Sequence, residues 1–293
     1  MANNSIRLAE FLRTHASVIR IELIRVRGSS PRNVGTEMFV SADALFGTIG
    51  GGQLEYLVIE HAREMLRDGA LNRAMNVPLG PEIGQCCGGR VELSLARMRD
   101  SDRSAAIQRA NDHDKARPHV YVMGGGHVGR ALANQLQHLP VQCVLVDTRP
   151  DEIALCNADV ETRISAIPEI EIMNAPSGSA FIVLTHDHGL DFLLTSAALE
   201  RGDATYVGMI GSATKRVKFR NWARDHNDQQ SIEHLNCPIG ASGSRDKRPS
   251  IIASFVVAEL MAELTSETVA PARHRAHETP ISGHRHNRKG ISA

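Results

Sequence analysis

The feature that most constrains the fold is a glycine triplet, Gly124, Gly126 and Gly129, with the spacing G-x-G-x-x-G. It follows an apolar run at 119–123 and precedes an amphipathic run at 128–139, which are predicted to be a strand and a helix. In such a unit the first glycine allows a tight turn, the second lets a phosphate approach, and the third lets helix and strand pack closely. The N-terminus of the helix then offers unpaired N–H groups to an anion. The sequence therefore predicts a Rossmann-like unit of the kind that binds nucleotides.

The residues after this unit continue the same alternation of strands and helices. A predicted strand at 142–146 ends at Asp147, where an acidic residue commonly binds a ribose hydroxyl. Further strands are predicted at 181–184 and 205–210, and helices at 190–201, 215–225 and 250–264. Alternating strands and helices predict a doubly wound parallel sheet over residues 118–266. A glycine turn in such a sheet can also serve packing alone, so the fold does not settle the ligand.

A polar cluster, Thr185, His186, Asp187 and His188, follows the predicted strand at 181–184. The carboxyl end of a strand in an open α/β sheet faces the ligand crevice. Two histidines with Asp187 and Asp191 can bind a metal or shuttle protons. Alternatively, Asp187 or Thr185 caps the next helix and the histidines lie in a polar loop. We expect the cluster to line the site rather than to bind metal.

The strand predicted at 205–210 is followed by Gly211 and Ser212, with Lys215 and Arg216 just inside the next helix. This arrangement can hold an anionic ligand. A solvated helix face explains the two cationic side chains equally well.

The first 98 residues have a different pattern and are predicted to form a small α+β domain. Strands are expected at 20–26, 37–40, 45–49 and 90–95, and helices at 8–14 and 53–67. The polar, charged segment 99–117 is predicted to be a linker to the second domain. Residues 267–293 are rich in His and Arg, so we expect a disordered tail.

Two adjacent thiols, Cys86 and Cys87, stand directly before Gly88 and Gly89. A disulfide between neighbouring cysteines strains the peptide bond that joins them, and glycines permit close approach of a ligand. One interpretation is therefore a soft, sulfur-bearing rim of a pocket. The other is a turn that buries two small apolar residues. A second glycine cluster, at 50–52, lies upstream between a predicted strand and a helix.

Composition excludes several classes of function. Lys plus Arg and Asp plus Glu both number 33, so no global basic field attracts nucleic acid or a membrane surface. Aromatic residues make up only 4%, which argues against base stacking. Five cysteines without regular spacing do not form a secreted disulfide framework. No signal-peptide pattern is seen, and Glu259 and Glu263 interrupt the apolar run 251–264. We expect a soluble protein of a reducing cytoplasm.

The order and number of these short motifs resemble the XdhC family, the accessory proteins that mature xanthine dehydrogenase and related molybdenum hydroxylases. The motifs are GSSPR at 28–32, GTIGGGQLE at 47–55, CCGG at 86–89, GGGHVG at 124–129, THDH at 185–188, YVGMIGS at 206–212 and CPIG at 237–240. Together they extend from the first domain to about residue 264 and leave only the linker and the tail uncovered.

The resemblance implies a chaperone-like protein rather than a catalyst. Members bind the molybdenum cofactor, protect it while its terminal sulfur is installed, and deliver it to the apo-dehydrogenase. The implied partners are apo-xanthine dehydrogenase, a cysteine desulfurase and a second copy of the chain.

The cofactor is a pterin with a phosphate at one end and a dithiolene-held molybdenum at the other. The glycine loop at 124–129 suits the phosphate. Cys86 and Cys87 suit the molybdenum or the transferable sulfur. We expect one composite cofactor site at a domain or dimer interface, formed by residues that the motifs supply: Gly50, Gly51, Gly52, Cys86, Cys87, Gly124, Gly126, His127, Gly129, Asp147, His186, Asp187, His188, Gly211 and Ser212.

Two alternatives stay open at the level of sequence. The glycine triplet and Asp147 also suit an NAD(P)-dependent oxidoreductase, although the first domain lacks an evident acid–base pair for hydride transfer. A nucleotide can bind the Rossmann-like unit in either case. A plain metal-binding scaffold could use the cysteine pair with His186 and His188.

Overall fold

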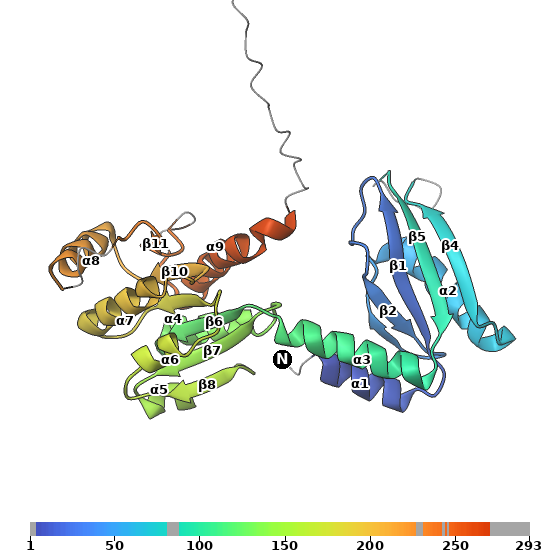
Figure 1. Cartoon of the computed structure of the whole chain (residues 1–293), viewed down its shortest axis with the longest axis horizontal. Coiled ribbons are helices and arrows are strands. Elements are labelled where there is room, and N and C mark those ends of the chain that lie inside the picture. The colour runs from blue at the N-terminus through green and yellow to red at the C-terminus, as the bar shows by residue number, and fades with distance from the viewer. Residues whose placement is uncertain (1–3, 81–87, 227–230, 242–243, 245, 270–293) are drawn as a thin grey trace, which may run out of the picture.

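The computed structural model describes residues 4–80, 88–226, 231–241, 244 and 246–269 of the 293-residue chain. It contains an antiparallel sheet and a parallel sheet in two separate domains, which are joined by a long helix (Figure 1). The predicted order, a small α+β domain followed by a Rossmann-like doubly wound domain, is confirmed.

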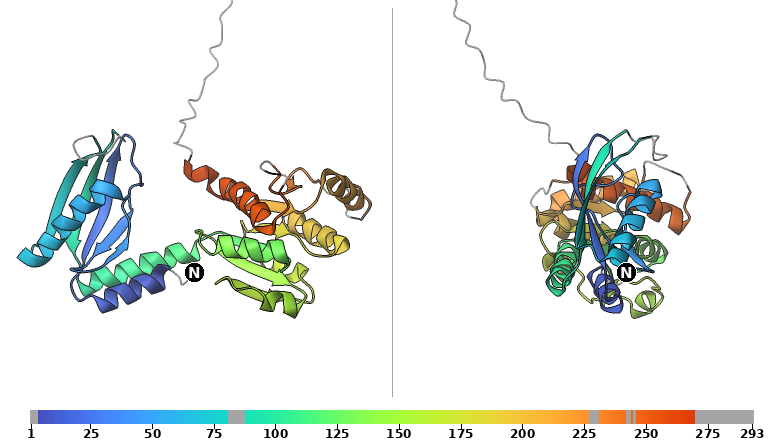
Figure 2. Two further views of the ribbon diagram at one scale, coloured as in Figure 1. Left: turned by 180° about the vertical axis from the view of Figure 1, so that it is seen from behind. Right: turned by 90° about the vertical axis from the view of Figure 1, so that its right-hand side faces the viewer.

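The first domain is a five-stranded antiparallel sheet with strand order β3-β2-β1-β5-β4. Its strands are β1 (Ile19–Arg27), β2 (Glu37–Val40), β3 (Leu45–Gly47), β4 (Asn72–Pro78) and β5 (Arg90–Arg97). The amphipathic helix α2 (Gly52–Asp68) covers one face, as the view from behind shows (Figure 2, left). Fully buried residues such as Ile21, Leu54, Val58 and Leu93 form the core between helix and sheet. On the other face, Phe39 and Phe46 pack in a smaller apolar cluster with α1 (Asn4–Thr14) and α3 (Asp100–Lys115).

The segment predicted as a linker is instead mostly a helix, α3 (Asp100–Lys115), which packs against α1 (Asn4–Thr14). The polar sequence of α3 is explained by its contacts, because Arg103 donates hydrogen bonds to the carbonyl oxygens of Leu12, His15 and Ala16. The buried carboxylate of Asp114 accepts a bond from the Ser5 N–H at 2.8 Å. The connection between the domains is therefore a helical pair rather than an extended linker.

The second domain is a six-stranded parallel sheet with strand order β11-β10-β9-β6-β7-β8. The strands are β6 (His119–Met123), β7 (Gln142–Asp147), β8 (Glu161–Ile164), β9 (Ala180–Val183), β10 (Tyr206–Met209) and β11 (Leu235–Asn236). The order reverses between β6 and β9, as in a Rossmann fold, and places a ligand crevice at their carboxyl ends.

Helices cover both faces of this sheet. One face packs against α4 (His127–Leu136), α5 (Pro150–Ala154) and α9 (Pro249–Val269). The other packs against α6 (Glu169–Met173), α7 (His188–Glu200) and α8 (Ala213–His226). The four residues of β9 are all buried, because helices cover both of its sides.

Helix α9 is longer than the sequence pattern indicated. Its segment Pro249–Ser266 is long and apolar enough to cross a membrane by length and composition alone. However, Ala253, Val256 and Leu260 on one side of it are fully buried in the core that α9 shares with α4. The helix is thus built into the parallel-sheet domain.

Candidate functional site

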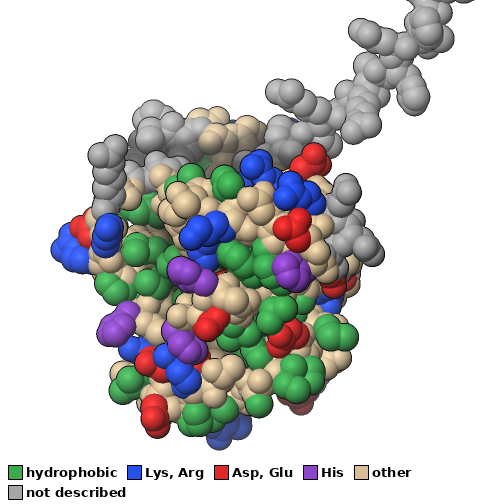
Figure 3. All heavy atoms as spheres, turned by 90° about the vertical axis from the view of Figure 1, so that its left-hand side faces the viewer, with side chains coloured by type: hydrophobic (Ala, Val, Ile, Leu, Met, Phe, Trp, Pro, Cys, Tyr) green, Lys and Arg blue, Asp and Glu red, His purple; other side chains and the backbone are tan. Residues whose placement is uncertain are grey.

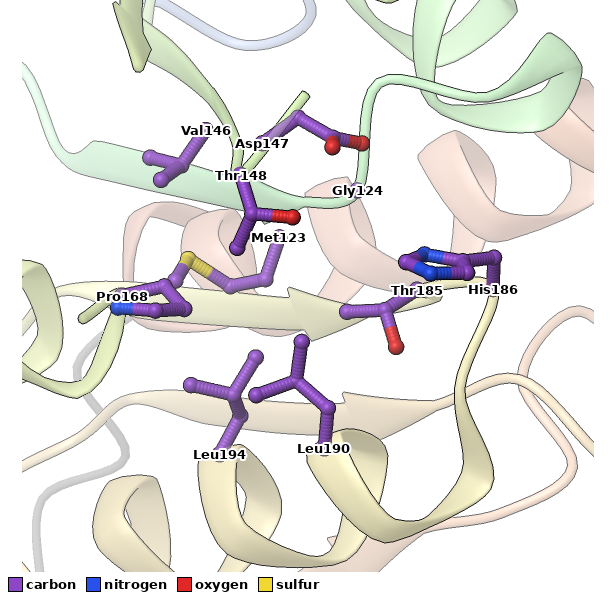
Figure 4. A pocket seen from close by; sticks show the side chains of 10 residues that line it. All are labelled: Met123, Gly124, Val146, Asp147, Thr148, Pro168, Thr185, His186, Leu190 and Leu194. Atoms are coloured by element: carbon purple, nitrogen blue, oxygen red, sulfur yellow. The ribbon is translucent and has the colours of Figure 1, made fainter. Parts of the chain in front are cut away.

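A hollow with about 230 Å³ of empty space lies at the switch point, where β6 and β9 end. Its floor is apolar, because Leu190 and Leu194 project from α7 toward Met123 and Pro168 (Figure 4). Its lining residues are Met123, Gly124, Val146, Asp147, Thr148, Pro168, Thr185, His186, Leu190 and Leu194. Much of that space is open to solvent, and the room inside the hollow is only about 10 Å³, about that of one water molecule. A ring of a ligand can therefore enter only if the lining side chains move apart.

The glycine loop at the rim of the hollow has two positions that exclude a side chain. Gly124 has a φ of +132°, and a Cβ there would lie 2.4 Å from the carbonyl oxygen of Leu184. A Cβ on Gly129 would lie 1.8 Å from the carbonyl oxygen of Gly124. These contacts explain the first and third glycines of the triplet by packing alone.

Gly126 is different, because nothing lies within 4 Å of the position that its Cβ would occupy. Its φ of −67° is ordinary for any residue. The fold itself therefore does not require glycine here. The open space in front of the backbone is where an anionic ligand could approach.

The helix that begins at this point has a bare N-terminus. No side chain caps α4, and no acidic residue stands in its first turn. By contrast, the Asp187 carboxylate caps α7, accepting hydrogen bonds from the N–H groups of Gly189 and Leu190 at 2.6 and 2.9 Å. The first N–H groups of a helix have no partner within the helix. Those of α4 thus face the crevice with the positive end of the helix dipole, an arrangement that suits a phosphate.

Asp147 lies beside this loop, but its carboxylate already has partners. One oxygen accepts a hydrogen bond from the Gly125 N–H at 2.6 Å and another from Arg149 Nη2 at 2.9 Å. The other oxygen accepts from the backbone N–H and Nε of Arg149. Burial alone would raise the pKa of Asp147, but these hydrogen bonds hold it below its usual value. A ribose could reach this carboxylate only if Arg149 moved.

Three residues of the polar cluster after β9 have different positions and roles. Asp187 is the helix cap that the sequence analysis offered as an alternative, whereas His186 lines the hollow. His188 is exposed at the start of α7. In Figure 1 the strands of the parallel sheet run leftward from α3, and histidine side chains spread over the face they point to (Figure 3). No group of three His, Cys, Asp or Glu side chains suited to a metal ion occurs among the described residues.

Sequence reasoning did not assign the buried ion pair beneath this cluster. Asp191 is fully buried, and one of its carboxylate oxygens accepts hydrogen bonds from the N–H and hydroxyl of Thr185, each at 2.8 Å. Its other oxygen pairs with the ammonium of Lys215. Gly211 lies against the stem of Lys215. The sequence analysis counted Asp191 with the polar cluster and gave Lys215 either an anionic ligand or a solvated helix face. It did not pair them, because the two residues are far apart in sequence.

Lys215 and Arg216 thus point inward rather than toward an anionic ligand. Arg216 donates to the carbonyl oxygens of Leu235 and Cys237 at 2.8 and 3.3 Å. The hydroxyl of Ser212 accepts from the Lys215 N–H at 3.2 Å. The loop at 211–212 is therefore part of the support of the site, and its exposed backbone remains open to contact.

Three motifs of the first domain meet at one end of the antiparallel sheet, which we call the glycine-rich end (residues 28–32, 50–52 and 88–89). A Cβ on Gly50 would lie 2.4 Å from Pro31 Cγ, and one on Gly89 would lie 1.9 Å from the carbonyl oxygen of Ser29. Ser29 and Gly88 also form an isolated β-bridge. Cys86 and Cys87 lie outside the described residues, so the expected thiol contact is not placed by the structure.

The glycine loop at this end is held by a carboxylate of its own chain. Glu55 accepts hydrogen bonds from the hydroxyl of Thr48 and from the Ile49 N–H, the latter at 2.9 Å. Burial would raise the pKa of Glu55, but these bonds and those from the N–H groups of Gly51 and Gly50 hold it below its usual value. The donors of the loop are thus directed at Glu55 rather than at a ligand.

The two clusters that the sequence analysis joined into one composite site lie in different domains. The hollow is lined by residues of the parallel-sheet domain, and the glycine-rich end lies at the top of the other domain in Figure 1. Within one described chain they do not touch. One shared site would need a second copy or a movement of the domains.

Comparisons with known proteins agree with the motifs. Residues 120–260 match the model of the XdhC Rossmann domain, and residues 11–73 match that of the XdhC and CoxI family. The chain is 24% identical over 251 residues to the uncharacterised protein YqeB of Escherichia coli (strain K12). That match covers 82% of this chain but 42% of YqeB, so the chain spans less than half the length of this curated relative.

The fold is also found among solved structures. A crystal structure described as a xanthine dehydrogenase from Bacillus halodurans superposes with a TM-score of 0.76 and 18% identity. The superposition covers 91% of this chain and 98% of that chain. At this identity the likeness shows a shared fold across both domains.

Proposed function

Because the chain belongs to the XdhC family, we propose that it is an accessory protein that binds the molybdenum cofactor, supports its sulfuration and delivers it to apo-xanthine dehydrogenase. The observation that carries the proposal is the bare N-terminus of α4 beside an apolar hollow. An anionic group and a flat ring side by side are what a phosphate-bearing pterin presents. Family membership supports the accessory role.

The proposed division of labour follows from which donors are free. The phosphate of the cargo binds the first N–H groups of α4 in front of Gly126. When the side chains that line the hollow move apart, one ring of the cargo enters it between Pro168 and Leu190, beside His186. Cys86 and Cys87, which directly precede Gly88 in the sequence, meet the molybdenum or the sulfur to be transferred. The sulfur donor in this scheme is a cysteine desulfurase.

A dimer would reconcile the distance between the two clusters. If two copies associate, the glycine-rich end of one can face the hollow of the other. The cytoplasm is the compartment that this function requires, because both the cofactor and free thiols are sensitive to oxidation.

The experiment is a two-step assay on the full-length protein produced in cells that make the cofactor. Molybdenum and pterin are measured in the purified protein, which is then mixed with apo-xanthine dehydrogenase while hydroxylase activity is followed. We expect cofactor to co-purify and activity to appear. A protein that carries no cofactor and restores no activity would refute the proposal.

An NAD(P)-dependent oxidoreductase remains the second candidate, because the strand order and glycine triplet are those of a dinucleotide-binding fold. The engagement of Asp147 by Arg149 weighs against it, since the usual ribose partner is occupied. Titration with NADH and NADPH separates the two. Tight binding with substrate-dependent oxidation favours the enzyme, and weak binding favours the accessory protein.

A further inference from the structure

A row of arginines stands on the open face of the antiparallel sheet, next to the glycine-rich end. Arg25 and Arg27 on β1 and Arg90 on β5 form this row, which we call the arginine patch. The side chains of Arg25 and Arg27 are 59% and 58% exposed, and Arg90 is also exposed. Helix α2 covers the opposite face of the sheet (Figure 2).

A β-bulge is what brings these arginines to the open face. The pairing of β1 with β5 shifts between Leu23 and Arg25, so the alternation of sides changes at that point. Without the shift Val26 would share the face of Arg20 and Glu22, and Arg25 and Arg27 would point to the core. With it, Val26 packs on the core and both arginines are exposed.

The register also places two positive charges directly opposite each other. Arg27 pairs with Arg90 across the two strands. Like charges in directly opposed positions on one face destabilise a sheet. Arg90 donates to the neutral Asn76 side-chain oxygen at 2.9 Å. Among the described residues, the carboxylate that pairs with this row is that of Glu92, which lies 3.8 Å from Arg25 Nη1 and 3.4 Å from Arg27 Nη2. The patch therefore keeps an excess of positive charge at a cost to the fold.

The arginine patch directly adjoins the glycine-rich end along the chain, which indicates a role for its excess positive charge. Arg27 directly precedes the 28–32 motif, and Arg90 directly follows Gly89. The bridge between Ser29 and Gly88 joins the same two strand ends. Any macromolecule that reaches the glycine-rich end must therefore come close to the patch.

We propose that the arginine patch is the docking surface for an acidic face of the client protein, apo-xanthine dehydrogenase, which it steers toward the glycine-rich end. This proposal rests on the proposed accessory function. Charge complementarity selects the occupant, because only an anionic surface relieves the repulsion between Arg27 and Arg90. The arginines stand on the open face of a sheet rather than in a pocket that would enclose a small anion, and Ile24 beside them is 46% exposed, which suits a protein surface.

The test measures two effects of one substitution, on the stability of the fold and on the rate of association. A purely structural role for Arg27 would slow association only together with a loss of stability. Arg27→Glu places a carboxylate opposite Arg90 but loses the pair with Glu92, so the two changes offset each other and the urea midpoint should stay close to that of the wild type. The same change should slow association with apo-xanthine dehydrogenase about tenfold at low salt, since steering depends on charge. Arg224→Glu is the matched control, because Arg224 is 62% exposed in the other domain and the change in net charge is identical.

Association rates are measured by surface plasmon resonance or stopped flow at several salt concentrations, and unfolding by urea in parallel. We expect the wild type and Arg224→Glu to associate at similar, salt-dependent rates, with Arg27→Glu slow at low salt. Equal rates for Arg27→Glu and Arg224→Glu overturn the proposal, as does a wild type whose association is absent or independent of salt. Inorganic pyrophosphate that competes beyond its effect on ionic strength also overturns it, because the patch would then be a phosphate site.

The cofactor content of Arg27→Glu distinguishes this failure from failure of the accessory function. If the wild type carries and delivers cofactor while Arg27→Glu docks normally, only the patch proposal fails. If the wild type carries none, the accessory function fails.

Discussion

The loop at 48–52 in the antiparallel domain and the loop at 124–129 in the parallel domain are both rich in glycine, and each leads into a helix. In the first, Glu55 collects the hydroxyl of Thr48 and the N–H of Ile49 inside the loop. In the second, Asp147 takes the N–H of Gly125 and of no other residue of that loop. Neither helix has a side-chain cap, but Glu55 stands in the first turn of α2 and no acidic residue stands in that of α4. The same residue type thus makes one loop that satisfies itself and one that leaves donors for a ligand. Glycine content alone does not identify a binding loop.

The largest effect is expected from substituting Gly129, the third glycine of the triplet in the second loop. In Gly129→Ala the new Cβ would lie 1.8 Å from the Gly124 carbonyl oxygen, which is rigid backbone. We expect a loss of about 3 kcal/mol or more in the stability of this domain. Trp222, the single tryptophan, lies on α8 of the same domain and reports its unfolding in urea.

Gly126→Ala is the matched control for that change, because its Cβ meets nothing within 4 Å. It should unfold within about 0.5 kcal/mol of the wild type. Equal urea midpoints for the two variants would contradict the close approach of helix and strand.

A second, somewhat smaller effect is expected from the carboxylate that braces this loop. Asp147→Ala leaves the buried Gly125 N–H and the Arg149 guanidinium without their acceptor. We expect a cost of about 2–3 kcal/mol, read from the same fluorescence. The exposed helix cap offers the comparison, since Asp187→Ala should cost only about 1 kcal/mol. If Asp147→Ala proves no more costly than Asp187→Ala, the bracing role is wrong.

The smallest effect concerns the first loop and depends on pH. Hydrogen bonds in the folded state hold the pKa of Glu55 below its ordinary value in the unfolded chain, so the stability that this carboxylate contributes is fully present above the ordinary pKa and is lost as pH falls through the lowered one. Glu55→Gln should cost about 1 kcal/mol at pH 7 and less in acid. Urea unfolding followed by far-UV circular dichroism at pH 7, 5 and 3.5 measures this. A constant difference between wild type and variant across that range would show that the Glu55 charge does not hold the loop.

The sequence predicted those strands and helices whose apolar residues follow a clear pattern along the chain. The buried strands β6, β7 and β9 and the helix α2 were found near their predicted positions, because helices or core cover their apolar residues. Strands β4 and β8 were missed. Both are edge strands with exposed polar residues, such as Asn72 and Glu161, so they lack the expected alternation.

The candidate site was predictable only in its backbone. The triplet and the residues after β9 marked the crevice, because glycine spacing and strand ends are local features. The partners of the charged groups are not local. Arg149 covering Asp147, and Lys215 reaching Asp191, depend on how neighbouring loops pack. The helix in place of a linker was missed for the same reason, since the partners of Arg103 lie on another segment.

The most direct test of the account is the amount of cofactor bound by variants of the two loops. Wild type, Gly126→Ala and Glu55→Gln proteins are purified from cofactor-producing cells, and molybdenum and pterin are measured per chain. Because no carboxylate stands in the first turn of the helix after the second loop, Gly126→Ala should lower cofactor affinity about tenfold or more, which corresponds to about 1.4 kcal/mol, with its fold intact. Glu55→Gln should retain its cofactor. Full occupancy in Gly126→Ala together with loss in Glu55→Gln would contradict the account and assign the cargo to the first loop.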